Sequence, residues 1–294
     1  MHGVERTAVN DTLIVYFSQG GTNKLVATSI SGSLLEAGHG VDLWNLKDGP
    51  PPSPLNYKLL GIGTPTYYYH APFNVTDYVN ALPDLTGLST FIFVVHGAYR
   101  GSTGNTVRQA LSQKGAREIG YFHCFGEDYF LGYLKEGYLL SPDHPTKEEL
   151  NRARDFGRAV AARLDGAPYV APDKDPPARL IYRFERFLAN RVFVKHIYSR
   201  SFRVSNRCRP DCDLCIRQCP CQNIRRDCSG RVRWGRNCLL CLSCEMDCPE
   251  DAITSPVSWP IFRPFMVLNT WLARRDPSLK NVRVVHRRGV TTRL

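Results

Sequence analysis

One cysteine pattern occurs twice between residues 207 and 253, and it constrains this chain more than any other feature. The two copies read Cys208-x3-Cys212-x2-Cys215-x3-Cys219-Pro220 and Cys238-x2-Cys241-x2-Cys244-x3-Cys248-Pro249. Runs of four cysteines that end in Cys-Pro are typical of iron–sulfur ligation, because closely spaced thiolates on a tight turn can surround one small inorganic core. The pattern therefore predicts a region that is held together by metal clusters.

In runs of this kind the fourth cysteine binds the cluster of the other run. We therefore predict two [4Fe–4S] clusters whose ligands are shared between the copies. The first ligand set is Cys208, Cys212, Cys215 and Cys248, and the second is Cys238, Cys241, Cys244 and Cys219. Because each set takes a cysteine from both copies, the two copies are expected to fold as one unit.

Two other uses of cysteine fit the pattern less well. Zinc sites usually consist of separated Cys-x2-Cys pairs, and disulfides require an oxidising compartment. The first copy has three residues between Cys208 and Cys212 where two are usual, so a three-iron cluster is the alternative there. Cys124, Cys221 and Cys228 lie outside the repeat and are interpreted as ordinary thiols.

The charge of the chain is concentrated in the cysteine-rich half. Residues 1–166 carry a net charge of −2 and residues 167–294 carry +13, which gives +11 in total. A basic surface suits an acidic redox partner, and a peripheral contact with an anionic membrane is the alternative.

We expect no nucleic acid partner and no membrane span, and the short polar segment before residue 12 lacks a secretion signal. A cytoplasmic location follows.

The first half alternates apolar strands with helical segments. Strands are predicted at 12–17, 41–46, 57–63, 90–96 and 118–125, with the last helix running to Leu164. Alternation of this kind predicts a doubly wound parallel sheet, and the absence of a dinucleotide fingerprint favours the strand order 2-1-3-4-5. The predicted class is thus α/β, followed by a small α+β region around the cysteines.

Three polar loops follow strands of this predicted sheet. Ligands bind at the carboxyl ends of such strands, where glycines, hydroxyls and a helix N-terminus can hold a phosphate and aromatic rings can stack on a flat heterocycle. The residues predicted to bind a flavin cofactor are Ser18, Gln19, Gly20, Gly21, Thr22, Asn23, Thr64, Pro65, Thr66, Tyr67, Tyr68, His96, Gly97, Ala98, Tyr99, Arg100 and Gly101. For each tyrosine taken alone, packing of the loop is an equally good interpretation, and for His96 alone a hydrogen-bonded histidine at the end of a strand is the better one.

The first of these loops resembles the FMN phosphate loop of flavodoxins, although Gly20 stands where a hydroxyl residue is usual. The segment 63–67 resembles their first ring-contacting loop. Together with the doubled cysteine motif, the chain resembles the flavodoxin–ferredoxin fusion proteins of the EFR-type ferrodoxin family. The resemblance implies FMN in the first domain and a ferredoxin-like second domain of the bacterial 2[4Fe–4S] type.

We predict four regions. These are a flavodoxin-like domain at 1–166, a linker and basic amphipathic helical bridge at 167–204, a ferredoxin-like domain at 205–258 and an extension at 259–294. The predicted function is electron transfer between FMN, the two clusters and an external partner, because flavins exchange one or two electrons and each cluster exchanges one. The alternatives are a flavin-dependent reductase of a small substrate and a nucleic-acid-binding zinc or cluster protein. Catalytic residues are not assigned, and whether the chain is an enzyme stays open.

Overall fold

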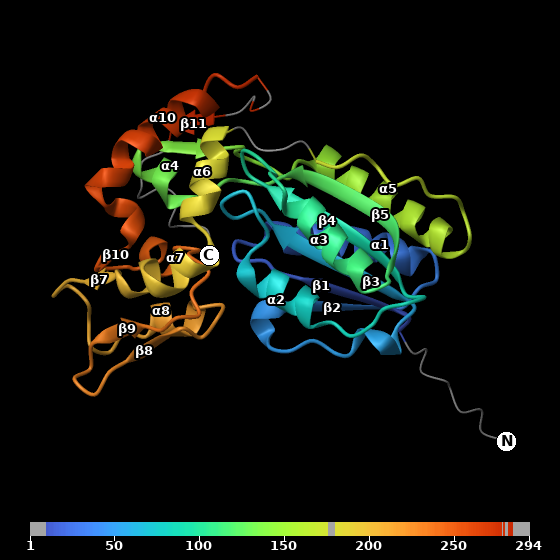
Figure 1. The fold of residues 1–294 in the computed structure, drawn as a ribbon, viewed down its shortest axis with the longest axis horizontal. Coiled ribbons are helices and arrows are strands. Elements are labelled where there is room, and N and C mark those ends of the chain that lie inside the picture. The colour runs from blue at the N-terminus through green and yellow to red at the C-terminus, as the bar shows by residue number, and fades with distance from the viewer. Residues whose placement is uncertain (1–9, 176–179, 278, 280–281, 285–294) are drawn as a thin grey trace.

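The computed structural model describes residues 10–175, 180–277, 279 and 282–284 (Figure 1). Its larger part is built on a parallel sheet of five strands in the order β2-β1-β3-β4-β5, which confirms the predicted order. The strands are β1 (Thr12–Tyr16), β2 (Val41–Asn45), β3 (Leu59–Pro65), β4 (Ser89–His96) and β5 (Arg117–Phe125). Every residue of β4 is buried, as is usual for a strand that is covered on both faces.

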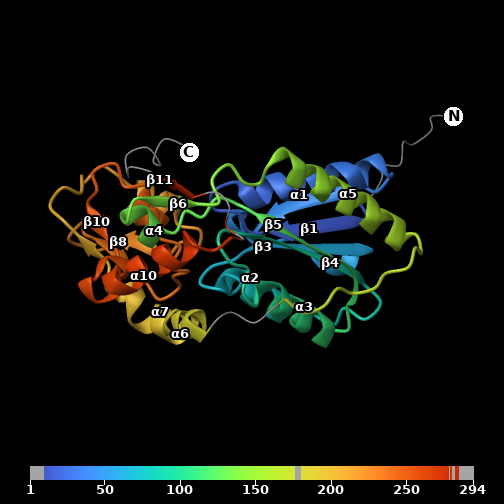
Figure 2. The same ribbon diagram turned by 90° about the horizontal axis from the view of Figure 1, so that it is seen from above.

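Two pairs of helices cover the sheet (Figures 1 and 2). The helices on one face are α1 (Thr22–Glu36) and α5 (Lys147–Leu164), and those on the other are α2 (Phe73–Ala81) and α3 (Thr103–Gln113). Each face has its own apolar core. Ile30 of α1 and Val160 of α5 belong to the first, whereas Val75 of α2 and Val107 of α3 belong to the second.

A short segment that contains two further elements connects β5 to α5. It contains α4 (Leu131–Lys135) and β6 (Tyr138–Leu140), and β6 pairs antiparallel with β11 (Val282–Val284) from the C-terminal part of the chain. These elements were not predicted from the sequence, because a three-residue strand depends on a partner far along the chain. The rest of the predicted basic stretch from Lys280 lies outside the described residues.

The cysteine-rich half consists of short elements. Its helices are α6 (Leu180–Leu188), α7 (Arg191–His196), α8 (Leu214–Gln218), α9 (Ser243–Met246) and α10 (Arg263–Ala273). Its strands are β7 (Arg203–Val204), β8 (Ile224–Arg226), β9 (Val232–Trp234) and β10 (Ile253–Thr254), and they form two antiparallel pairs, β7 with β10 and β8 with β9. The predicted bridge between the halves is therefore a pair of helices, α6 and α7.

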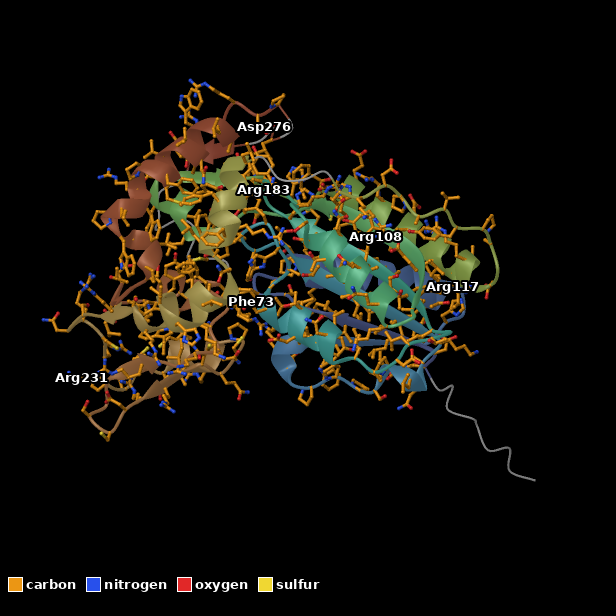
Figure 3. All side chains as sticks on the ribbon, in the orientation of Figure 1. Phe73, Arg108, Arg117, Arg183, Arg231 and Asp276 are labelled. Carbon is orange, nitrogen blue, oxygen red and sulfur yellow. The ribbon has the colours of Figure 1, made fainter. Side chains whose placement is uncertain are left out.

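The cysteine-rich half packs against the loops at the carboxyl ends of the sheet strands. Phe73, labelled in Figure 3, contacts the apolar clusters of both halves. The Tyr68 hydroxyl donates a hydrogen bond to the Leu240 carbonyl at 2.9 Å. Arg191 of α7 forms an ion pair with Asp77 of α2. No described helix combines the length and the apolar character that crossing a membrane requires.

Candidate functional site

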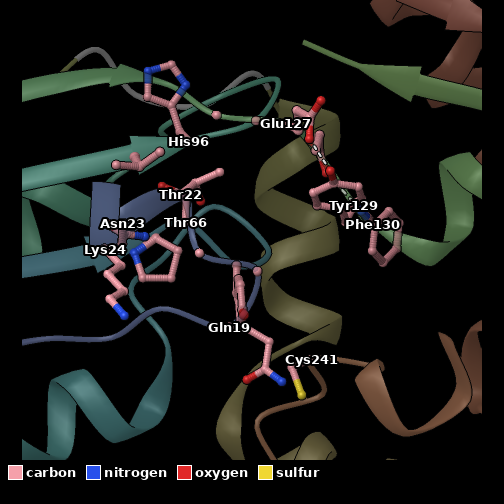
Figure 4. Close-up of a pocket in the computed structure, with 18 of the residues that line it drawn as sticks. Gln19, Thr22, Asn23, Lys24, Thr66, His96, Glu127, Tyr129, Phe130 and Cys241 are labelled. Atoms are coloured by element: carbon pink, nitrogen blue, oxygen red, sulfur yellow. Dashed lines mark hydrogen bonds between the residues drawn. The ribbon is translucent and has the colours of Figure 1, made fainter. Parts of the chain in front are cut away.

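A cavity of about 1350 Å³ lies where the two halves meet. Loops that follow β1, β3, β4 and β5 form one side of it, at 19–24, 65–69, 96–99 and 126–130. The other side includes 217–220, Leu240, Cys241 and Ser243 of the cysteine-rich half. Figure 4 shows Gln19 of the first loop and Cys241 on this cavity. The site is therefore shared between the halves.

The loop after β1 presents backbone donors to the cavity. Gly21 precedes α1 in a left-handed conformation with φ of 90°, which glycine adopts without strain. Ser18 Oγ accepts the Lys24 N–H at 3.3 Å. The N–H groups of Thr22 and Asn23 belong to the first turn of α1, so no carbonyl of the helix accepts a hydrogen bond from them. The buried Asn23 side chain also has an oxygen without a hydrogen-bond partner among the described residues. Together these groups form a small polar cradle at a helix N-terminus.

The loop after β3 brings three consecutive tyrosines to the cavity wall. Tyr68 and Tyr69 have positive φ values of 48° and 65°, so the chain turns tightly between Tyr67 and His70. The rings then point to different neighbours. Tyr67 packs edge-on against Phe17, Tyr68 edge-on against Phe130, and Tyr69 stacks on Tyr182 of α6 at a centroid distance of 4.8 Å. The tyrosines therefore line the cavity and also join the two halves.

The loop after β4 approaches the loop after β5 closely. A Cβ atom on Gly97 would lie 2.3 Å from the Asp128 carboxyl, and the Ala98 N–H donates to that carboxyl at 3.0 Å. The His96 ring packs against Phe125, and burial lowers its pKa to about 3. His96 is therefore neutral near pH 7 and adds no positive charge to the cavity.

The structure brings most of the predicted flavin-binding residues to this cavity. Those on its wall are Gln19, Gly20, Gly21, Thr22, Asn23, Pro65, Thr66, Tyr67, Tyr68, His96, Gly97, Ala98 and Tyr99. Ser18 and Thr64 are buried and do not line it. Arg100 turns away and pairs with Asp175 at 3.1 Å, and Gly101 packs under Tyr69. The long-range partner Asp175 lies 75 positions away, so the local sequence could not reveal this pairing.

Sequence reasoning missed the loop after β5 and the contribution of α6. Asp128, Tyr129 and Phe130 line the cavity, as does Glu185 from α6. The β5 loop could have been found from topology alone, since it follows a strand of the same parallel sheet. The sequence around Glu185 does not indicate a place on the cavity wall, because its position depends on how the helical bridge packs.

The eight cysteines of the repeat lie around two small cavities. The first is lined by Cys208, Cys212, Cys215, Cys244 and Cys248. The second is lined by Cys219, Cys221, Cys238, Cys241 and Cys244. Each cavity thus contains one complete predicted ligand set, and Cys244 borders both. Cys221, which lies outside the repeat, joins the second group.

Backbone N–H groups point at several of these sulfur atoms. The N–H groups of Asn223, Leu240 and Ala252 lie 3.2 to 3.3 Å from the sulfurs of Cys219, Cys238 and Cys248, respectively. Burial, followed by repulsion from neighbouring thiolates, raises the pKa of Cys215 to about 11, and burial raises that of Cys241 to the same value. A nearby cation, a helix N-terminus or a bound metal lowers the pKa of such a thiol and favours its ionised form.

In the described parts of the chain, no three His, Cys, Asp or Glu side chains converge closely enough to hold one metal ion. A four-iron cluster makes a different demand. Each thiolate binds a different iron atom, so the sulfurs surround the cluster and do not meet at a point.

Comparison with known proteins bears on the first half. Residues 13–132 match the family model of the flavodoxin domain. The N-terminal region is a flavodoxin-like domain. Similar solved structures include flavodoxin 2 from Bacillus cereus, with 22% identity, coverage of 52% of this chain and 99% of that one, and a TM-score of 0.41. Rubredoxin oxygen:oxidoreductase from Desulfovibrio gigas shares 15% identity over 55% of this chain and 37% of its own, with a TM-score of 0.42. No curated protein matches the chain.

The cavity loops at 19–24, 65–69, 96–99 and 126–130 all lie within the matched part of the flavodoxin-like domain. A domain of this kind indicates flavin-based electron transfer and implies FMN as its cofactor. The family match ends before the cysteine repeat begins.

Proposed function

We propose that the chain is an electron-transfer protein that binds FMN in the cavity of its flavodoxin-like domain and two [4Fe–4S] clusters in its cysteine-rich half. The observation that carries the proposal is the shared cavity. Its wall contains the loops of the flavodoxin-like domain together with Cys219 and Cys241, two predicted ligands of the second cluster. A flavin held by these loops would lie beside that ligand set, which is the arrangement that electron transfer within one chain requires.

The residues of the cavity fit a flavin nucleotide. The N–H groups at the start of α1 and the hydroxyl of Thr22 suit a phosphate, and α1 adds the partial positive charge of its N-terminus. Tyr67 and Tyr68 suit a flat ring system. When bound, a flavin supplies exchange of one or two electrons, and the chain positions it and excludes water.

The two cysteine groups fit two clusters with ligands exchanged between the copies of the repeat. Cys248 borders the cavity of the first copy, and Cys219 borders that of the second copy. The N–H groups near Cys219, Cys238 and Cys248 are the contacts that stabilise cluster sulfur and tune its potential. Cys208 lies with Cys212 and Cys215 despite the longer spacing, which favours a four-iron first cluster over the three-iron alternative.

The domain boundaries follow from this assignment. The flavodoxin-like domain extends to residue 166, α6 and α7 connect it to a ferredoxin-like domain at 205–258, and residues 259–294 form an extension. The basic cysteine-rich half suits an acidic redox partner. Unpaired thiols suit the reducing cytoplasm.

A second candidate is a reductase that accepts a small substrate directly at the flavin. The cavity volume favours it, because about 1350 Å³ exceeds the range of roughly 300 to 1000 Å³ that one ligand usually occupies. Turnover of a small acceptor by the purified protein without a partner protein would identify this activity.

Anaerobic purification with quantification of iron, sulfide, zinc and FMN tests the proposal. We expect about eight iron atoms and one FMN per chain, at four irons per cluster. Replacing Cys241 by alanine should lower the iron content, whereas replacing the exposed Cys228, which lines neither cysteine cavity, should not. Stoichiometric zinc with no acid-labile sulfide would contradict the proposal.

A further inference from the structure

A buried carboxyl group lies on the wall of the shared cavity. Glu185 belongs to α6, is 8% exposed and faces the same space as the flavodoxin-like loops. The Asn269 side chain of α10 donates a hydrogen bond to it at 3.2 Å. Buried carboxylates are usually paired with a cation, so an acid in this position requires an explanation.

The groups around Glu185 include no cation that pairs with it among the described residues. The groups that act on it are Tyr68 and Tyr69 from the loop after β3, Tyr133 from α4, Asp128 from the loop after β5 and Asn269 from α10. The three tyrosines and the amide of Asn269 are neutral near pH 7, and Asp128 can carry only a negative charge. Burial raises the pKa of Glu185 to about 7. The carboxyl is therefore close to half ionised at neutral pH.

We propose that Glu185, when it is ionised, takes up a proton as an electron enters the cavity, and releases that proton when the electron leaves. The inference rests on the proposed function, because it requires a redox group in the cavity. A new negative charge nearby disfavours the charged form of a carboxylate and raises its affinity for a proton. A group that is half ionised beforehand responds most strongly to that change.

The step is balanced in charge and in atoms. One electron comes from a reduced one-electron carrier protein by way of the cysteine groups, and one proton comes from solvent and forms an O–H bond on Glu185. In molecules in which Glu185 was ionised beforehand, the total charge of the cavity is unchanged. When the electron passes to its acceptor, that O–H bond breaks and the proton returns to solvent. Glu185 thus offsets the charge of the electron by binding a proton, and it forms no bond to the cofactor.

The test is the pH dependence of the midpoint potential of bound FMN in the full chain, between about pH 6 and pH 9. We expect a bend in the potential near pH 7 that is lost in Glu185→Gln. Tyr69→Phe removes a hydroxyl that lowers the pKa of Glu185, so its bend should move to higher pH. Glu118→Gln is the matched control, because Glu118 pairs with Arg108 away from the cavity, and it should behave as the wild type.

A second readout does not depend on the flavin. Infrared titration of the flavin-free chain should show a protonated carboxyl band that disappears as the pH rises through about 7 and is missing from Glu185→Gln. A bend that persists unchanged in a flavin-loaded Glu185→Gln variant would overturn this inference alone. Failure of the chain to bind FMN would overturn the proposed function and this inference together, and absence of the infrared band would overturn only the inference.

Discussion

At the scale of single residues, the packing of the sheet in the flavodoxin-like domain depends on two glycines of β3. A Cβ atom on Gly63 would lie 2.1 Å from the ring of Phe93 on the neighbouring strand β4, and the same holds for Gly61 and Phe91 at 2.3 Å. The two aromatic rings fill the space above the glycines and complete the core beneath α1 and α5. Glycine is required here for close approach and not for an unusual backbone conformation.

We therefore expect Gly63→Ala to destabilise the protein by about 1–3 kcal/mol, because the ring of Phe93 would have to leave a well-packed position. The matched control is Gly32→Ala in α1, where nothing lies within 4 Å of the added methyl group. That substitution should stabilise the helix by about 0.5–1 kcal/mol. Urea unfolding of both variants measures the contrast, and equal effects would refute the argument.

The raised pKa of Glu185 also predicts how the free energy of unfolding depends on pH. Its pKa is raised in the folded protein from 4.5 to about 7, so the folded state binds more protons than the unfolded state between these values. The contribution of Glu185 is fully present below about pH 4.5 and is lost as the pH rises through about 7. Relative to the wild type, Glu185→Gln should gain up to about 3 kcal/mol on going from acidic to mildly alkaline pH. Urea unfolding at both pH values measures this, and parallel curves would contradict it.

At the scale of elements, α5 is fixed to the sheet through its first turn. Thr146 accepts the Glu149 N–H at 3.2 Å, and Glu149 accepts the Thr146 N–H at 2.7 Å, which is a complete capping box. The other Glu149 oxygen accepts the N–H of Phe125, the last residue of β5, at 3.1 Å. One carboxylate therefore sets both the start of the helix and its distance from the strand.

Replacing Thr146 by alanine should lower the free energy of unfolding by about 1 kcal/mol, since one N–H at the start of the helix loses its acceptor. Thr146→Ser keeps the hydroxyl and should change stability much less. Differential scanning calorimetry of the two variants distinguishes them. A loss of the same size in the serine variant would show that the methyl group of Thr146, and not its hydroxyl, is responsible.

The same elements show how far sequence reasoning reaches. The order of the five strands could be predicted, because apolar runs such as 90–96 are continuous and the loops between them carry glycine and hydroxyl residues. Predicting that most flavin-loop residues lie together required only that parallel strands end at one edge. The pairing of Arg100 with Asp175 and the place of Glu185 on the cavity wall depend on contacts between residues far apart in the sequence, for which no local pattern exists.

At the scale of the whole molecule, a buried ion pair connects the two halves. Lys135 of α4 contacts Glu245 of α9, whose side chain is 2% exposed and also accepts the Ser255 N–H at 2.7 Å. Glu245 follows Cys244, the cysteine that borders both cysteine cavities. The pair therefore links the segment between β5 and α5 to the centre of the cysteine-rich half.

Removing the lysine would leave the Glu245 carboxylate buried without its cation. We expect Lys135→Met to destabilise the cysteine-rich half by about 3–5 kcal/mol, the usual effect of breaking a buried pair from one side. The control is Arg158→Met, because Arg158 pairs with Glu36 and Asp155 on the surface, where all three side chains are more than half exposed. Such pairs contribute about 0–1 kcal/mol.

Hydrogen exchange of the full chain locates the effect. Lys135→Met should speed exchange in α9 and in the segment around Ser255, while β1 to β4 of the flavodoxin-like domain keep their protection. If exchange accelerates equally across the sheet, the ion pair stabilises the molecule as one cooperative unit, and the cysteine-rich half has no separate unfolding step. If neither region changes, Glu245 is protonated or solvated in the variant, and the buried pair does not hold the halves together.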